Sequence, residues 1–364
     1  MAVGFPAKTS YANGDVFSAS DINDTNGTLN LATGAQWAAA KNKIINGDFR
    51  FNQRTFTSTT TSGTYGFDRF WLQRGAGGTV TYSAQTFTAG TAPVAGYEAI
   101  NFARLVTVSQ SATTDYAVLR QSIEDVRTFA NQTVTVSAWI KAGTNGQLAN
   151  FGLAQNFGGG GSGEVYTKGA NLTLTTSWAR YSTTFTVPSI AGKTIGTSSS
   201  LNADIWTSGG SAISAYTGIG NQNATIDMWG LQVEQGSTAT AFQTASGSIG
   251  GELALCQRYY LSWVTGTTQT IGIGTYTGGG TAVTTANFPV TMRIQPTLVV
   301  ATGTNYYRFN RVSADDDFNS FTIFNASFQA MGFYNASEVS GTSGTSGYMY
   351  TNNASASIAF NAEL

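Results

Sequence analysis

The sequence predicts an all-β protein, with a β-sandwich followed by a smaller β domain. Glycine is abundant at 43 residues, whereas proline occurs only 5 times. Glycine supplies the positive φ angles that tight turns between strands require. Aromatic residues, which favour strands, make up 12% of the chain, and a hydrophobic content of 41% favours packed cores over disorder. At 364 residues the chain is long enough for two or three domains.

Charge and cysteine content argue against several classes of function. Charged residues make up 10% of the chain and the formal net charge is −1, so we expect no nucleic-acid partner. With no histidine and one cysteine, Cys256, the chain lacks the usual zinc ligands and the usual catalytic base. No apolar run approaches the roughly 20 residues that cross a bilayer. The N-terminus also lacks an apolar signal segment. We therefore expect no cofactor, no metal and no membrane insertion.

Residues 1–41 differ from the rest and are predicted to form an arm. Ser20 is placed to cap a short helix with acidic residues in its first turn. Ile22 and Leu29 share one face of this helix, which is too small to fold alone. We expect the arm to pack on other copies of the chain or on another protein, with Tyr11, Ile22 and Leu29 as candidate contacts. The alternative is a disordered leader.

Residues 42–245 contain the alternating segments of a β-sandwich. In the cleanest strand, at 131–143, valines and Ile140 face one way while Trp139 faces the other. The glycine-rich loop at 155–165 has no lysine ending and no following helix, so it is not a phosphate-binding loop. Turn signals separate the further strand-like segments, as a sandwich requires. These segments lie at 67–75, 97–109, 117–126, 172–188 and 204–208.

Residues 246–364 are predicted to form the second β domain, opened by a short helix. Ser248 can cap this helix, and Leu253, Cys256 and Tyr260 recur at spacings of three and four residues. That spacing predicts an apolar face made of these three residues. Strand-like segments follow, and the last one, "SASIAFNAEL", alternates well enough to predict that it belongs to a sheet.

The carboxylates give little support for catalysis. A glycosidase needs two carboxyl groups on opposite sides of the bond that it cleaves. Several of the candidates fall in predicted strands or turns, where a structural role is sufficient, so we expect a protein that is not an enzyme. Asp315, Asp316 and Asp317 are candidate cation ligands, because calcium prefers clustered oxygen atoms. Three consecutive side chains cannot converge from one strand, however, so we expect this run to form a solvated turn. The candidate carboxylates are Asp68, Glu98, Glu124, Asp125, Glu164, Asp204, Asp227 and Glu234.

Aromatic residues are the candidates for recognition, because saccharide rings stack on Trp and Tyr. Trp139 lies opposite the apolar face of its strand, so it is either exposed or packed against a second layer. The segment "NYYRFNR" brings together Tyr306, Tyr307 and Arg308, residue types that are typical of binding surfaces. We expect a receptor contact first at this cluster and at "GYMYTNN", with the face of Trp139 as the competing site.

Several segments resemble fibre proteins of tailed phages and prophages. "LQVEQGSTATAFQ" followed by "GELALCQRYY" is similar to the junction between a jelly-roll domain and a distal domain in those proteins. "NKIINGDFRFNQRTF" with "FDRFW" resembles the opening of the jelly roll, and "FPVTMRIQPTL" with "NAEL" resembles the distal module. The match touches most of residues 42–364. The segment "YANGDVFSASDIN" also resembles the attachment arm of phage appendages.

The resemblance implies a structural virion protein of a tailed phage, either a tail fibre or a head fibre. It implies a virion-attachment arm at 1–41, a jelly roll similar to carbohydrate-binding modules at 42–245 and a distal β domain at 246–364. A homotrimer exposed on the particle surface, bound to other virion proteins through the arm and contacting host surface glycan, would follow. A decoration protein or a free carbohydrate-binding protein is the alternative, and a glycan-degrading tailspike comes third. Such jelly rolls often hold a structural calcium, for which Asp48 and Glu234 are the nearest equivalents.

Overall fold

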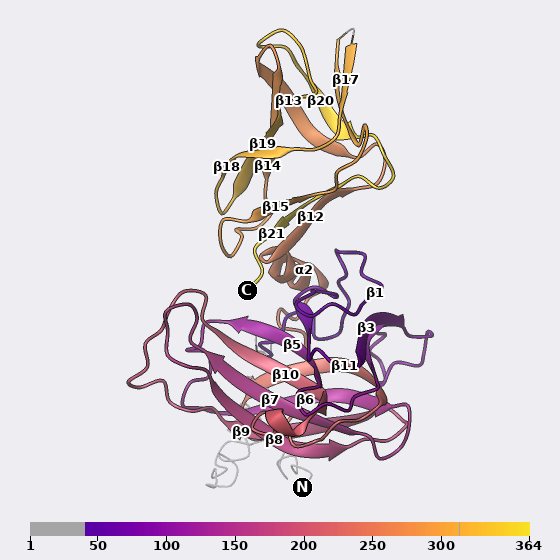
Figure 1. The fold of residues 1–364 in the computed structure, drawn as a ribbon, viewed down its shortest axis with the longest axis vertical. Helices are drawn as coiled ribbons and strands as arrows, with labels where there is room; N and C mark the ends of the chain where they lie inside the picture. Colours follow the sequence, from indigo (N-terminus) through magenta and orange to yellow (C-terminus); the bar gives the residue numbers. More distant parts are fainter. Residues whose placement is uncertain (1–40, 313) are drawn as a thin grey trace, which may run out of the picture.

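A computed structural model describes residues 41–312 and 314–364 of the chain. It has two β regions that follow one another along the longest axis, with helix α2 (Ile249–Gln257) between them (Figure 1). The larger core draws on residues between Ile44 and Val233, and the second on residues between Leu261 and Ala362. The predicted class, an all-β protein with a jelly-roll sandwich first and a smaller β-rich domain second, is confirmed. The arm residues Tyr11, Ile22 and Leu29 lie outside the described residues.

Two antiparallel sheets form the sandwich, with strand orders β1-β3-β4-β11-β6-β9 and β2-β5-β10-β7-β8. Alternation explains the core between them, because every second side chain of a strand points to the same face. Val134, Val136 and Ile140 of β6 are buried there, as the sequence predicts, and they meet Leu119 and Phe151 of the opposite sheet in one cluster. The strands of the first sheet are β1 (Ser58–Thr59), β3 (Thr79–Thr86), β4 (Asn101–Val108), β11 (Ala224–Gln235), β6 (Thr133–Ala142) and β9 (Ala179–Thr186). Those of the second are β2 (Phe70–Arg74), β5 (Tyr116–Glu124), β10 (Ser200–Gly209), β7 (Leu148–Asn156) and β8 (Val165–Thr173).

The distal domain consists of a three-stranded and a seven-stranded antiparallel sheet. In the first, the strand expected in the last segment, β21, lies between β12 and β15. In the second, the order is β17-β16-β20-β13-β14-β19-β18. The strands of the small sheet are β12 (Tyr260–Thr265), β21 (Ser357–Asn361) and β15 (Thr297–Val300). Those of the large sheet are β17 (Ala314–Phe318), β16 (Tyr307–Arg311), β20 (Ser346–Thr351), β13 (Thr270–Gly278), β14 (Thr281–Asn287), β19 (Ala330–Asn335) and β18 (Thr322–Ala326).

Helix α2 begins where the sequence predicts, but it buries a different face. Ser248 caps it by accepting a hydrogen bond from the backbone N–H of Gly251 at 3.1 Å. The fully buried residues of the helix are Glu252 and Cys256, whereas Leu253 is only half-buried. The expected apolar face made of Leu253, Cys256 and Tyr260 is therefore confirmed only at Cys256, since Leu253 is half-buried and Tyr260 lies beyond the helix, at the start of β12. The Glu252 carboxylate accepts a backbone hydrogen bond from Asn46 at 2.6 Å, so a charged residue points inward. Among the described helices, none is long and apolar enough to cross a membrane.

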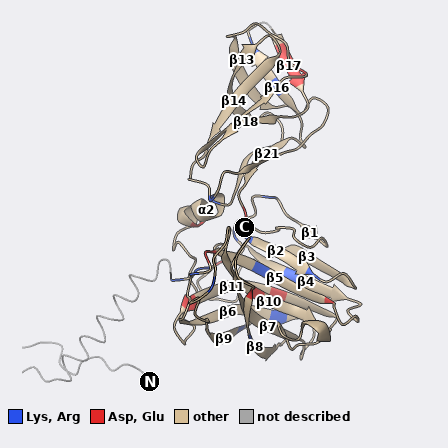
Figure 2. Cartoon of the chain, turned by 60° about the vertical axis from the view of Figure 1, so that its left-hand side comes forward, with Lys and Arg blue, Asp and Glu red and all other residues tan. Residues whose placement is uncertain are grey.

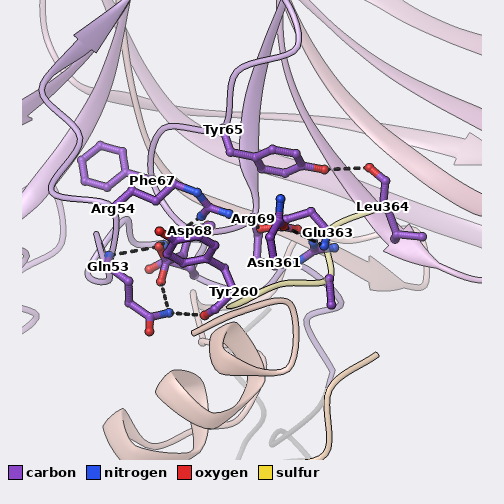
Figure 3. Close-up of polar contacts among 12 residues, drawn as sticks. Gln53, Arg54, Tyr65, Phe67, Asp68, Arg69, Tyr260, Asn361, Glu363 and Leu364 are labelled. Atoms are coloured by element: carbon purple, nitrogen blue, oxygen red, sulfur yellow. Dashed lines mark hydrogen bonds and ion pairs between the residues drawn. The ribbon is translucent and has the colours of Figure 1, made fainter. Parts of the chain in front are cut away.

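Cationic side chains of the sandwich dock the distal domain at a joint that Figure 3 shows in close-up. Arg69 is fully buried, lies 3.4 Å from the centre of the Tyr259 ring and pairs with Glu363. Arg54 lies 3.6 Å from the centre of the Tyr260 ring and 3.1 Å from the Glu363 carboxylate. A guanidinium over an aromatic face is attracted by the ring as well as by the acid. Each arginine thus contacts both ends of the distal domain.

Hydrogen bonds donated by uncharged side chains complete the joint. The Gln53 amide donates both to the buried Asp68 carboxylate at 2.7 Å and to the backbone oxygen of Tyr260 at 2.8 Å. The Tyr65 hydroxyl donates to the backbone oxygen of Leu364 at 2.9 Å. Burial raises the pKa of Asp68 to about 6, although Arg54 and Gln53 oppose the shift. The short segments "NQRTF", "FDRFW", "CQRYY" and "NAEL", together with Tyr65, therefore supply the contacts of this joint.

Candidate functional site

Strand register builds a row of charged and aromatic residues on the outer face of the five-stranded sheet. Trp71 of β2 faces Arg120 of β5, which faces Asp204 of β10, which in turn faces Gly152 of β7. Their neighbours along each strand, such as Leu119, point into the core. Figure 2 shows the charged residues of this sheet at β5 and β10. Four strands that are distant in sequence thus place one polar row across the middle of the sheet.

The centre of the row is a buried ion pair. Arg120 and Asp204 meet as a fork, with Nε 2.6 Å from Oδ1 and Nη2 2.7 Å from Oδ2. Arg120 is 8% exposed and Asp204 is 1% exposed. The guanidinium also lies 5.5 Å from the centre of the Trp71 ring. The two parallel bonds of this bidentate pair fix the orientation of Arg120, which also lines a cleft.

Aromatic side chains surround the ion pair. The Trp206 indole N–H donates to the Tyr166 hydroxyl at 2.5 Å, and the Tyr216 ring is stacked on Trp206 with an interplanar angle of 23°. The Tyr116 ring also lies near Trp206, at 5.8 Å between ring centres. Tyr166 lies directly over Gly152, where a Cβ atom would stand 1.7 Å from its hydroxyl oxygen. Gly152 is therefore required for this arrangement of rings.

Two clefts, of about 390 Å³ and about 250 Å³, are lined by both aromatic and charged side chains. The smaller cleft opens between the ring cluster and the ion pair. It is lined by Gln73, Tyr116, Arg120, Glu164, Trp206, Ile213 and Tyr216.

Two features of the smaller cleft favour a ligand with hydroxyl groups. The buried Gln73 Oε1 atom has no hydrogen-bond partner among the described residues, and neither has the buried Nε1 atom of the nearby Trp71. Desolvation raises the pKa of Glu164 at the rim, against the lowering effect of Arg120. Buried polar atoms without partners are uncommon in proteins. Of these two atoms, Gln73 Oε1 belongs to a residue that lines the cleft, whereas Trp71 is not part of the lining.

The larger cleft lies where α2 meets the sandwich, and several of the side chains that line it are charged. It is lined by Asp48, Arg50, Tyr97, Glu98 and Glu252 among others. The Asp48 carboxylate accepts a hydrogen bond from the Tyr97 hydroxyl at 2.7 Å, and one of its oxygens has no partner within the described part of the chain.

The two residues suggested for a calcium ion have separate partners. Asp48 lies in the larger cleft, whereas Glu234 pairs with Lys41 at 3.0 Å and accepts a hydrogen bond from the Thr240 hydroxyl at 2.6 Å. Within residues 41–312 and 314–364, no group of three or more His, Cys, Asp or Glu side chains is placed to hold a metal ion.

The three residues of the expected receptor cluster in the distal domain do not share one face, because successive side chains at β16 point to opposite sides of its sheet. Tyr307 is 0% exposed, and its hydroxyl donates to the backbone oxygens of Ala301 and Ser357 at 2.6 and 2.9 Å. The prediction that Tyr307 contacts a receptor is therefore wrong, because alternation along β16 turns its side chain into the core. Tyr306 is half-buried, while Arg308 forms a fork with Asp317.

The acidic run at 315–317 is also corrected, since it lies in a strand and not in a turn. β17 pairs with β16, and this acidic strand is red in Figure 2. Asp315 and Asp317 both approach Arg308, at 3.3 and 2.5 Å. Asp316 instead pairs with Arg311 at 3.0 Å. The three carboxylates therefore do not converge, as the sequence argument about consecutive side chains in a strand requires.

Trp139 lies among its cross-strand neighbours Trp229 and Arg180 of the same sheet, and among the described aromatic side chains only Phe242, from the segment after β11, covers it from a second layer. Its ring lies 5.5 Å from that of Trp229 and 6.2 Å from that of Phe242. The Arg180 guanidinium lies 4.6 Å from the ring centre. Trp139 is half-buried in this cluster, so little of its ring face is free to stack on a ligand.

Local sequence patterns did not connect the residues around the smaller cleft with one another. Glu164 and Asp204 were two of eight candidate carboxylates, and Trp71 and Trp206 are two of the seven tryptophans in the chain. Arg120 was missed, although it stands in the middle of a buried strand. That position was the available signal, because a charged residue is almost never buried without a partner.

No protein-family model and no curated protein matches the chain. Among solved structures, it is similar to the enzymatically active domain of tailspike protein 4 from bacteriophage CBA120, with 12% identity, a TM-score of 0.32 and coverage of 54% of this chain and 21% of that one. It is also similar to the CBM22-1 xylan-binding domain from Paenibacillus barcinonensis, with 13% identity, a TM-score of 0.30 and coverage of 55% and 98%. A cyclase from Fischerella sp. TAU gives 11% identity, a TM-score of 0.34 and coverage of 54% and 97%. The chain thus spans about a fifth of the tailspike domain that it matches, and all three similarities concern the fold alone.

Proposed function

We propose that this chain is a structural protein of a tailed-phage virion and that its sandwich binds a host-surface saccharide in the cleft beside Trp206. The observation that carries the binding proposal is the cleft itself, which combines aromatic rings with a buried acceptor that has no partner. Saccharides expose both apolar ring faces and hydroxyl groups. A site for them therefore needs aromatic surface and a few fixed polar groups, with little net charge.

Each side chain of the cleft has a role in this proposal. Tyr216 is 38% exposed and offers a ring face on which a pyranose ring stacks. Arg120, held in place by Asp204, donates to a hydroxyl oxygen, while Gln73 accepts from a hydroxyl group through its Oε1 atom. Because the ion pair and the ring cluster fix these groups before binding, the ligand does not have to order them.

We further propose that the cleft binds without cleaving. Hydrolysis of a glycosidic bond requires an acid and a second carboxylate, either a base or a nucleophile. Both oxygens of Asp204 are engaged by Arg120, so Asp204 is not free to act on a ligand. Glu164 is the remaining carboxylate in the described lining of the cleft. Incubation of the protein with host polysaccharide should therefore leave the length of the glycan unchanged.

The virion part of the proposal rests on the segments that resemble phage fibres. These segments supply the joint between the two β regions, so the resemblance concerns how the modules are connected. In this proposal residues 1–41 attach the protein to other virion proteins. Several copies, expected to be a trimer, then present their clefts together at the particle surface. Multivalent presentation would raise the avidity of weak single-site binding.

Binding of full-length protein to an array of bacterial surface glycans, followed by titration with the best ligand, tests the proposal. Tyr216→Ala should weaken binding at least tenfold, because it removes the exposed ring of the cleft. Phe328→Ala is the matched control, since Phe328 is an exposed aromatic residue of the distal domain (53% exposed). Equal binding by wild type and Tyr216→Ala would move the site away from the cleft. Failure of the wild type to bind any glycan would end the saccharide proposal.

A further inference from the structure

We propose that the cleft selects saccharide units without an acidic group and that Glu164 is the residue that determines this selectivity. This inference rests on the saccharide binding proposed above and deepens it. It follows from the charges that face the cleft, from the hydrogen-bonding groups that its lining leaves unpaired and from the position of Glu164 at the rim.

The charges around the cleft leave one negative group uncompensated. The Arg120 guanidinium and the Asp204 carboxylate neutralise one another in their fork. Glu164 lines the same cleft, and within the described residues it forms no ion pair. Lys168 on β8 is the nearest lysine along the strand, but its ammonium group donates to the backbone oxygen of Ser214 at 2.7 Å. The segment at 209–223, which includes Tyr216, carries no charged residue.

The hydrogen-bond acceptors of the cleft that have no partner among the described residues discriminate between kinds of saccharide. Gln73 Oε1 and the Glu164 carboxylate only accept hydrogen bonds. A hydroxyl group donates to them and accepts from Arg120, so a neutral sugar satisfies both, and an ammonium group also donates to Glu164. A sugar carboxylate only accepts, and within a cleft of about 250 Å³ it would stand close to the like charge of Glu164. Repulsion at such short range is not fully screened by water, and about tenfold discrimination is the expected scale.

Acidification should weaken this discrimination. Desolvation raises the pKa of Glu164, although Arg120 opposes the shift, so the group takes up a proton at a higher pH than a free glutamate does. Once protonated, Glu164 no longer repels a carboxylate and can donate to it. The preference for neutral over acidic saccharides should therefore be greatest near pH 7 and should decline as the pH falls toward the pKa of Glu164.

The test uses the full chain and an array of matched oligosaccharides of glucose, N-acetylglucosamine, glucosamine and glucuronic acid, with titration of the members that bind. Wild type should bind neutral or amine-bearing members at least tenfold more tightly than acidic ones. Glu164→Gln should reduce this ratio to about twofold. Glu98→Gln is the matched control, because Glu98 is an exposed glutamate in the other cleft and should leave the ratio unchanged.

The outcomes separate this inference from the proposed function. If wild type binds glucuronic acid oligomers as tightly as glucose oligomers, the proposed selectivity is wrong, although the protein still binds saccharides. An unchanged ratio in Glu164→Gln, or an unchanged ratio for wild type between pH 7 and pH 4.5, would remove Glu164 as its determinant. The pH series needs no variant, so it reports even if a substitution impairs folding. Absence of binding to every saccharide would remove the proposed function, and this inference with it.

Discussion

Substitution of Glu363 by glutamine should loosen the joint between the sandwich and the distal domain. Glutamine keeps the shape of glutamate but removes the charge that faces Arg69 and Arg54. The side chains of Arg69 and Glu363 are 1% and 4% exposed, so the substitution leaves a guanidinium in the interior without its anion. Burying the Arg69 guanidinium costs desolvation free energy, and without the anion of Glu363 nothing of comparable strength offsets that cost.

The expected loss is about 3 kcal/mol of unfolding free energy. Removing one partner of a buried ion pair costs about 3–5 kcal/mol. We take the lower end because Arg69 retains two favourable contacts, a hydrogen bond to the backbone oxygen of Ser122 and the face of Tyr259. Arg54, which is more exposed, can also turn toward solvent, with its side chain 14% exposed.

Urea denaturation at pH 7, followed by tryptophan fluorescence, measures the loss. Limited proteolysis of the segment between β11 and α2 reports separately on undocking. Asp125→Asn is the control, because Asp125 pairs with Arg127 at the surface, where the side chains are 43% and 60% exposed. An exposed pair should contribute less than about 1 kcal/mol. A loss in Glu363→Gln no larger than in this control would refute the view that the buried pair holds the joint.

Four further predictions concern pH, the cleft, the distal domain and assembly. Because burial raises the pKa of Asp68 from 3.8 to about 6, its contribution to stability is present below pH 4 and is lost as the pH rises through 6. The unfolding free energy of wild type relative to Asp68→Asn should therefore fall by about 3 kcal/mol, at about 1.4 kcal/mol per pKa unit, between pH 3.5 and 7; a flat difference would contradict this. Gly152→Ala should displace Tyr166 and weaken saccharide binding at least tenfold in titration, whereas Gly163→Ala, at a position with open space around it, should have no effect. If the distal domain adds a host contact, Tyr306→Ala with Arg308→Ala should lower adsorption to host cells without changing the saccharide affinity of the cleft, and unchanged adsorption would discard that contact. Light scattering should return three times the 38.2 kDa of one chain, and a stable monomer would exclude the trimer.

Local sequence patterns predicted much of the fold because local rules decide those features. The strand at 131–143 alternates strictly, and the observed β6 buries the predicted face. The cap at Ser248 follows from the hydrogen-bonding geometry of a helix end. The burial of Glu252 could not be read in the same way, since its partner Asn46 is 206 residues distant in the sequence.

The cleft was beyond local reasoning for a similar reason. Arg120 and Asp204 are 84 residues apart, and only the pairing of β5 with β10 makes them neighbours. Each residue read alone is a polar interruption of a strand. Tyr307 is the opposite case, because its position between Tyr306 and Arg308 is typical of a binding cluster, whereas the strand places its side chain in the core.

The distal domain is anchored at both of its ends, and this has a consequence for how such proteins can diversify. Its first strand, β12, pairs with its last, β21, so the polypeptide enters and leaves the domain at the same place (Figure 1). The anchoring side chains, Tyr259, Tyr260 and Glu363, sit at the two boundaries of the segment that they enclose. Of the residues between these boundaries, Arg293 and Ile294 also face the sandwich across a cleft. A different β domain that kept the two boundary segments would therefore retain the anchoring contacts of Tyr259, Tyr260 and Glu363, whereas its far end is free to differ.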